Sequence, residues 1–133
     1  MPHTRRTLLL DVQNWDLVLD TDSIGGPAGA PRGRIAVASG AYATAQNVAN
    51  ECRVFTDDLA FERERGIPYF LVTLGRKPSP SVLKARLRDA ALLVDDVAEV
   101  AAVELESLDT DRRTVTGEIK CRTQEGEDAS AGI

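Results

Sequence analysis

Residues 39–70, SGAYATAQNVANECRVFTDDLAFERERGIPYF, contain the pattern that decides the fold of this chain. Apolar side chains recur there at steps of three and four residues, which places them on one face of a helix that packs against other elements. That apolar face comprises Tyr42, Ala45, Val48, Ala49, Cys52, Phe55 and Leu59. The opposite, polar face comprises Gln46, Asn47, Asn50, Glu51, Arg53 and Asp57. Ser39 is expected to cap the helix by accepting a hydrogen bond from an early backbone N–H.

Short strands are expected on the N-terminal side of this helix. Leu8–Val12 and Leu17–Asp20 are predicted strands separated by the turn-forming residues Gln13–Asp16, and one bulged strand fits the same residues. Residues 21–33 contain four glycines and two prolines, so a loop is expected there. Arg34–Ala38 is a short, mostly apolar segment after this loop and is predicted to be a strand.

A second helix is predicted to begin at Pro80, because Ser79 suits the N-cap and proline suits the first helical position. Its buried side chains are expected to be Leu83, Leu87, Ala90, Ala91 and Val94. A C-terminal antiparallel hairpin follows, with its turn at Asp109–Arg112. Its strands are expected to rest on the core through Val103, Leu105, Val115 and Ile119.

These signals predict a single α+β domain over residues 7–122. Two main helices pack on a small mixed sheet, and the C-terminal hairpin completes it. Residues 1–6 are expected to be flexible, and residues 123–133 are expected to form a disordered acidic tail, because their side chains are mostly small or charged. The length of 133 residues suits one hydrophobic core.

Composition argues against two classes of partner. The chain is 43% hydrophobic and 28% charged, and its apolar runs are too short to span a bilayer or to act as a signal peptide. We therefore expect an intracellularly made protein without a membrane partner. The net charge is −5 and the basic residues are scattered, so nucleic acid is not an expected partner.

The chain offers few groups for catalysis or metal binding. His3 is the only histidine, so a paired nucleophile and base are not expected, and neither is a zinc site. Cys52 and Cys121 are predicted to be buried thiols. No Gly-Lys-Ser/Thr sequence occurs to bind a nucleotide. We expect no catalytic residue, no cofactor and no metal ligand.

Carboxylates are the remaining catalytic resource. Asp57, Asp58, Glu62 and Glu64 cluster after the first helix, and two carboxyl groups about 5 to 10 Å apart are able to hydrolyse a glycosidic bond. The competing interpretation is a solvated turn in which Arg63 and Arg65 pair with the neighbouring acids. No apolar pocket is predicted around them.

Three short strings carry a resemblance to a known family. GAYATAQNVAN at residues 40–50, CRVF at 52–55 and GIPY at 66–69 resemble the small baseplate wedge and sheath-initiator proteins of contractile-tailed phages. That family includes the T-even gene 25 product and a type VI secretion baseplate subunit. WDL at 15–17, IA at 35–36 and LGRKP at 74–78 agree in order, so the resemblance covers residues 7–122. Many members carry a Glu-Pro-Arg signature after the first helix, whereas this chain has FERERG at 61–66 without the proline.

The resemblance implies a structural component of the tail baseplate. Six copies would join the wedge to the tail tube and template the first ring of sheath subunits, with the terminal hairpin accepting their strands by β-augmentation. The implied partners are the sheath protein, other wedge proteins, and tube or hub proteins. The implied location is the virion, after assembly in the bacterial cytoplasm.

The expected partner interface combines turn aromatics, helix residues and the charged hairpin face. Its residues are Trp15, Arg53, Phe55, Glu62, Arg63, Tyr69, Glu104, Glu106, Lys120 and Arg122. Two alternatives stay open at this point. One is a small lysozyme-like glycan hydrolase that uses Asp58, Glu62 or Glu64, and the other is an adaptor domain that binds one partner through the same strand edge.

Overall fold

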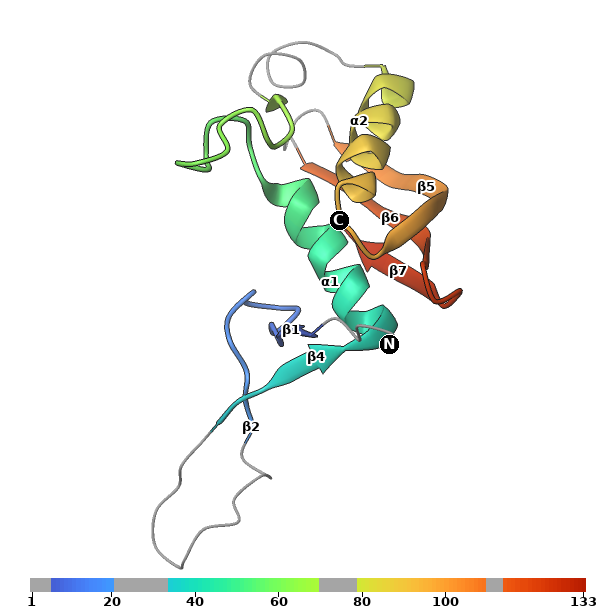
Figure 1. Ribbon diagram of the computed structural model, residues 1–133. Helices are drawn as coiled ribbons and strands as arrows, with labels where there is room; N and C mark the ends of the chain where they lie inside the picture. Colours follow the sequence, from blue (N-terminus) through green and yellow to red (C-terminus); the bar gives the residue numbers. More distant parts are fainter. Residues whose placement is uncertain (1–5, 21–33, 70–78, 110–113) are drawn as a thin grey trace, which may run out of the picture.

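The computed structural model describes residues 6–20, 34–69, 79–109 and 114–133 (Figure 1). Its elements in chain order are β1 (Arg6–Leu8), β2 (Leu19–Asp20), β3 (Arg34–Ile35), β4 (Val37–Ser39), α1 (Gly40–Arg53), α2 (Pro80–Leu92), β5 (Val97–Asp109), β6 (Thr114–Thr123) and β7 (Asp128–Gly132). The predicted loop at 21–33, residues 110–112 of the predicted turn and residues 1–5 of the predicted flexible terminus lie outside the described residues.

The α+β class is confirmed, with two helices and antiparallel sheets. β1 pairs with β4, β2 pairs with β3, and β5, β6 and β7 form a three-stranded sheet in that order. All these strand pairs are antiparallel. Among the described residues, the one parallel contact is the isolated bridge between Phe55 and Ile67, so the sheets are less mixed than predicted.

The N-terminal residues form the predicted hairpin as a short, irregular ribbon. Leu10 and Leu17 bridge across the turn, and the backbone N–H of Asp11 donates to the carbonyl of Asp16 at 2.8 Å. Three backbone hydrogen bonds then link Leu9, Val18 and Ala36, because the N–H of Leu9 donates to Ala36, that of Ala36 to Val18 and that of Val18 to Leu9. They join the two sides of the hairpin to the segment that precedes α1. Two turn-separated strands are therefore correct here, and the single bulged strand is not.

Helix α1 begins where predicted and ends earlier. Ser39 holds the N-cap position with extended backbone, but its side chain makes no capping hydrogen bond, so the predicted cap is wrong. The helix ends at Arg53 because Val54 turns extended and its N–H donates to Glu51. Phe55 and Leu59 therefore lie beyond the helix, in the loop that returns at Ile67, and do not continue its apolar face.

Both faces of α1 are partly buried, which differs from the prediction. Gln46 is 6% exposed because its side chain bonds the N-terminal ribbon, accepting from the Leu10 N–H at 2.9 Å and donating to the Leu8 carbonyl at 2.6 Å. Glu51 is buried by an ion pair with Arg65. Tyr42, in contrast, is exposed. A neighbouring backbone or side chain supplies each buried polar group with a partner, so its burial is tolerated.

The core lies between the two helices and the three-stranded sheet (Figure 1). Helix α2 packs on β5 and α1 packs on β7. The predicted buried side chains are confirmed: Leu83, Leu87, Ala90 and Ala91 are buried on α2, and Val94 is buried just beyond its end. Ser79 holds the N-cap position, although its Oγ lies 2.6 Å from the Oγ of Ser81 and caps no backbone N–H.

Both cysteines are free and buried, as predicted. Burial raises the pKa of the Cys52 thiol to about 12, and it raises the pKa of Cys121 as well. Cys121 lies on the inner face of β6 beside Ile119, and Cys52 lies on α1 in the same cluster. These thiols therefore act as core side chains.

The C-terminal hairpin is confirmed, and the chain then adds a strand that the sequence does not predict. β5 and β6 pair through Val103 with Ile119 and Glu104 with Glu118. The sequence predicts disorder for residues 123–133, whereas Asp128–Gly132 pair with β6 as β7. Ala129 and Ala131 alternate with exposed residues and are buried against α1. Their small side chains let the helix approach closely, which stabilises a strand of low hydrophobicity.

Candidate functional site

Strand β7 has an outer edge that no strand of the described chain covers, because β7 is the last strand in the order β5-β6-β7. Ile133 and Gly117 exchange both backbone hydrogen bonds, at 3.0 and 3.1 Å. In an antiparallel ladder the inward-bonding residues alternate, so Ala131 and Ala129 also bond to β6. Ser130, Gly132 and Asp128 consequently direct their peptide groups outward. These three residues offer backbone donors and acceptors to a further strand.

The opposite edge of the sheet is less suited to a partner strand. The pairing of β5 with β6 shifts register three times, between Val97 and Glu99, between Val100 and Ala102, and between Leu105 and Ser107. Such bulges bend a strand and interrupt the regular spacing of its backbone groups. The β6–β7 pairing runs from Arg122 and Asp128 to Glu118 and Gly132 without a shift.

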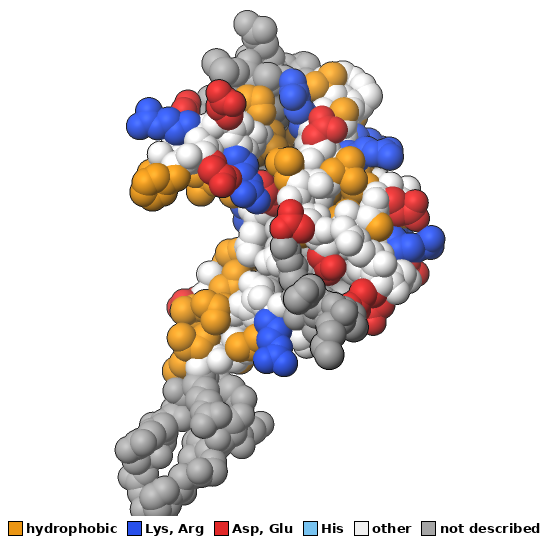
Figure 2. Space-filling view, viewed as in Figure 1, with side chains coloured by type: hydrophobic (Ala, Val, Ile, Leu, Met, Phe, Trp, Pro, Cys, Tyr) orange, Lys and Arg blue, Asp and Glu red, His pale blue; other side chains and the backbone are white. Residues whose placement is uncertain are grey.

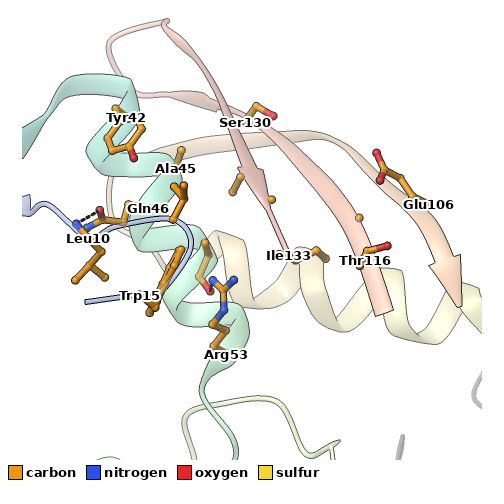
Figure 3. Close-up of a pocket in the computed structure, with 15 residues that line it drawn as sticks. Leu10, Trp15, Tyr42, Ala45, Gln46, Arg53, Glu106, Thr116, Ser130 and Ile133 are labelled. Carbon is orange, nitrogen blue, oxygen red and sulfur yellow. Dashed lines mark hydrogen bonds between the residues drawn. The ribbon is translucent and has the colours of Figure 1, made fainter. Parts of the chain in front are cut away.

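A groove of about 400 Å³ lies beside the edge of β7 (Figure 3). Helix α1 and the ends of β6 and β7 form two of its sides, and the N-terminal hairpin forms another. The lining residues are mostly apolar or small, and we call this the β7 groove. They are Leu10, Val12, Trp15, Tyr42, Ala45, Gln46, Ala49, Arg53, Glu106, Thr116, Gly117, Ser130, Ala131, Gly132 and Ile133.

Trp15 and Arg53 lie together at one end of the β7 groove (Figure 3). The guanidinium carbon of Arg53 is 3.9 Å from the centroid of the indole ring, in cation–π contact. The indole Nε1 donates to Asn50 Oδ1 at 2.9 Å, and Arg53 Nη1 donates to the Ala49 carbonyl at 3.3 Å. Both side chains are therefore held in place by α1.

A turn centred on Asp11 positions Trp15. The Asp11 carboxylate accepts hydrogen bonds from the Gln13 and Asn14 backbone N–H groups, and from the Asn14 side chain at 2.7 Å. The Trp15 N–H donates to the Asp11 carbonyl at 2.8 Å. Trp15 itself has a φ of 55°, a left-handed conformation that a non-glycine residue adopts only when its surroundings impose it.

Acidification is expected to release this turn. The hydrogen bonds from the Gln13 backbone and then the Asn14 side chain hold the pKa of Asp11 below its ordinary value of 3.8. The ionised Asp11 carboxylate therefore stabilises the turn above pH 3.8. This stabilisation is lost as the pH falls through the lowered pKa that Asp11 has in the folded chain. Trp15 is the only tryptophan, so its fluorescence should change below about pH 4. At neutral pH, Asp11→Ala should show the Trp15 fluorescence that the wild type shows only in acid. If the Trp15 fluorescence of Asp11→Ala still changed with pH as it does in the wild type, this account would be wrong.

The structure distributes the other predicted interface residues over two further places. The rings of Phe55 and Tyr69 contact each other where the 54–69 loop begins and ends, with centroids 4.8 Å apart and planes tilted by 52°. The Tyr69 hydroxyl donates to the Cys52 carbonyl at 2.7 Å, and burial raises the pKa of Tyr69 to about 12. These two aromatics therefore fix the loop to α1. Glu62 and Arg63 lie further along the same loop, exposed to solvent.

The charged residues predicted on the hairpin lie mainly on the outer face of the sheet. Lys120 contacts Glu104 at 3.3 Å, and Arg122 contacts Glu99 at 3.2 Å. Glu106 alone of this set lines the β7 groove. Because β6 is paired on both sides, Lys120 and Arg122 have no backbone edge to offer, so augmentation at β6 is ruled out.

The clustered carboxylates lie exposed on the 54–69 loop. Asp58 accepts from the Phe55 N–H at 3.3 Å, and Glu62 accepts from Arg65 at 2.9 Å. The buried carboxylate of this region is instead Glu51, which accepts from Arg65 Nε at 2.7 Å and Nη2 at 2.8 Å. Within residues 6–20, 34–69, 79–109 and 114–133, no three His, Cys, Asp or Glu side chains are grouped to hold a metal.

A second surface feature lies on the N-terminal ribbon. Hydrophobic side chains gather there on one side of the molecule (Figure 2). Large apolar residues of this ribbon that are exposed are Leu8, Val12, Leu17, Leu19, Ile35 and Val37. A cluster of exposed apolar side chains such as this one is typical of a surface that contacts another protein.

No protein-family model matches the chain, and a search of curated proteins finds no match either. In the described ranges, neither helix has the length and hydropathy needed to cross a bilayer. Function is therefore inferred from the residues themselves and from the geometry of the β7 groove.

Proposed function

We propose that this protein is a structural component of a contractile phage tail baseplate and that it templates the sheath through the outer edge of β7. A strand from a sheath subunit adds beside β7 as the fourth strand of the sheet. The observation that carries this proposal is the β7 edge beside the regular β6–β7 pairing, where Ser130 and Gly132 line the β7 groove and direct their peptide groups away from β6. The resemblance over residues 7–122 supplies the identity of the partner.

The groove gives an added strand both hydrogen bonds and apolar contact. Each backbone hydrogen bond contributes about 1 kcal/mol net, so a short edge binds only weakly alone. Ala45 and Ala49 provide a small-residue surface on α1 beside it. Six copies around a tail, as the family resemblance implies, would add these weak contacts together.

Other contacts in the assembly suit other surfaces. The exposed apolar side chains of the N-terminal ribbon suit another wedge protein, or a tube or hub protein, because their burial stabilises an interface. The location that belongs to this proposal is the virion baseplate. An adaptor that binds one partner through β7 differs from this proposal only in the partner.

The proposal is tested by Ser130→Pro against Ser130→Ala. Both variants lose the hydrogen bond from the Ser130 hydroxyl to Glu118. Only proline also removes the outward N–H, and it leaves the β6–β7 ladder bonds in place because the backbone of Ser130 takes no part in them. We expect Ser130→Pro to give tail tubes without attached sheath and Ser130→Ala to give sheathed tails, as counted by electron microscopy.

The thermal unfolding of the two purified variants should be compared in parallel, so that loss of folding is recognised. Gly132→Pro, which also removes an outward N–H, provides a second variant. Normally sheathed tails from both folded proline variants would overturn the proposal.

A further inference from the structure

Among the described residues that line the β7 groove, Arg53 is the one basic residue and Glu106 is the one acidic residue. In the described part of the chain, Arg53 forms no ion pair with a carboxylate. The chain as a whole carries a net charge of −5, so a fixed cation in this groove differs from the surface average. A guanidinium with free N–H groups is suited to accepting a carboxylate with two parallel hydrogen bonds.

The guanidinium is already ordered before a partner arrives. It stacks on Trp15 and donates to the Ala49 carbonyl, while Trp15 is tied to Asn50. Because a flexible arginine loses side-chain entropy on binding, this ordering lowers the cost of forming a new ion pair. Its order comes from two separate elements, the N-terminal hairpin and α1.

The two charged residues of the β7 groove lie on different elements, Arg53 on α1 and Glu106 on β5. Figure 3 shows Arg53 near Trp15 and Glu106 apart from it, with Ile133 and Thr116 between them in this view. Because β7 and β6 separate Glu106 from the outer edge of β7, Arg53 is the charged residue of the groove that we expect an acidic side chain on the added strand to meet.

We infer that the strand bound beside β7 carries an acidic side chain opposite Arg53, and that this single ion pair sets the register of the strand. The inference rests on the proposed function, because it requires an extended segment in the β7 groove. A slip of two residues moves the carboxylate about 7 Å along the strand, beyond hydrogen-bonding reach. A slip of one residue turns it to the other face.

Synthetic peptides provide the probe. Each is ten residues long, acetylated and amidated, with alternating serine and valine and a lysine at each end. A glutamate is scanned along the peptide, with glutamine at the same position as the control. Binding to the purified full chain is measured by fluorescence anisotropy. At one position we expect the glutamate peptide to bind about tenfold more tightly than its glutamine control, and this ratio should fall with salt.

Arg53→Gln should reduce the ratio to about one and leave the affinity for the glutamine peptide unchanged. Arg53→Lys, which keeps the charge but not the two-pronged geometry, should give an intermediate ratio. Circular dichroism of each variant checks that α1 is retained.

Ser130→Pro separates this inference from the proposed function. Suppose that Ser130→Pro weakens the binding of every peptide, while the wild type binds the glutamate and glutamine peptides equally at all positions. The inference about Arg53 is then overturned and β-augmentation stands. If Ser130→Pro weakens none, or if no peptide binds, both fail. Tighter binding of a peptide with a free C-terminal carboxylate, in place of a preference for the glutamate, would also overturn the assignment to an acidic side chain.

Discussion

Gly66→Ala is expected to destabilise the folded chain by about 3 kcal/mol, a large fraction of the stability of a small domain. Gly66 has a φ of +109°, a conformation that costs an L-residue about 1 to 3 kcal/mol. A Cβ there would also lie 2.6 Å from the Phe55 carbonyl carbon and 2.7 Å from its oxygen. These are backbone atoms of the Phe55–Ile67 bridge, which closes the 54–69 loop, so they cannot simply move aside.

Gly126→Ala is the matched control for this prediction. Gly126 has a φ of +85°, but a Cβ there would meet nothing within 4 Å. Gly126→Ala should therefore lower the free energy of unfolding only by the cost of the left-handed backbone conformation, about 1 kcal/mol. Urea unfolding of both variants, compared at equal slopes, measures the difference. Equal losses in the two variants would contradict the close approach at Phe55.

Arg65→Ala should have the second largest effect on stability. It leaves the Glu51 carboxylate without its partner, and the Glu51 side chain is only 9% exposed. Removing one member of a buried pair typically costs about 3 to 5 kcal/mol. Since the Arg65 side chain is 38% exposed, water replaces part of the interaction, and we expect a loss of about 2 kcal/mol.

Glu62→Gln provides the control on the same guanidinium. Glu62 contacts Arg65 at 2.9 Å, but its side chain is 60% exposed. Such a surface pair contributes about 0 to 1 kcal/mol, so the urea midpoint should change little. The account would be wrong if Arg65→Ala lost no more stability than Glu62→Gln.

The elements that depend on local pattern were predictable from the sequence. The periodic apolar positions of α2 and the alternation of the β5–β6 hairpin both matched the structure. The end of α1 was not predictable in the same way. The helical spacing of apolar residues continues to Phe55 and Leu59. Phe55 nevertheless lies outside the helix, because its backbone pairs with Ile67 in a β-bridge.

The elements that depend on distant partners were missed. Gln46 and Glu51 looked like exposed polar residues, but their partners lie 36 and 14 residues away in the sequence. β7 was hidden by its small and acidic composition, although the alternation of Ala129 and Ala131 was a weak signal for it.

The candidate site was accessible from the sequence only in part. Trp15 was proposed because it sits beside turn-forming residues, and Arg53 because the resemblance implies that the first helix faces other wedge proteins; both line the groove. The sequence predicted that the C-terminal hairpin offers a strand edge but did not identify which strand carries it. Which strand is left at the edge depends on the pairing of residues 118–122 with 128–132, and no local pattern contains that information.

A density map of the baseplate in an assembled contractile tail that contains this protein tests the central claim most directly. We predict a fourth strand from a neighbouring sheath subunit along β7, about 4.8 Å away, bonded to Ser130 and Gly132. A β7 edge that faces solvent, or that is covered by something other than an extended chain, would contradict it.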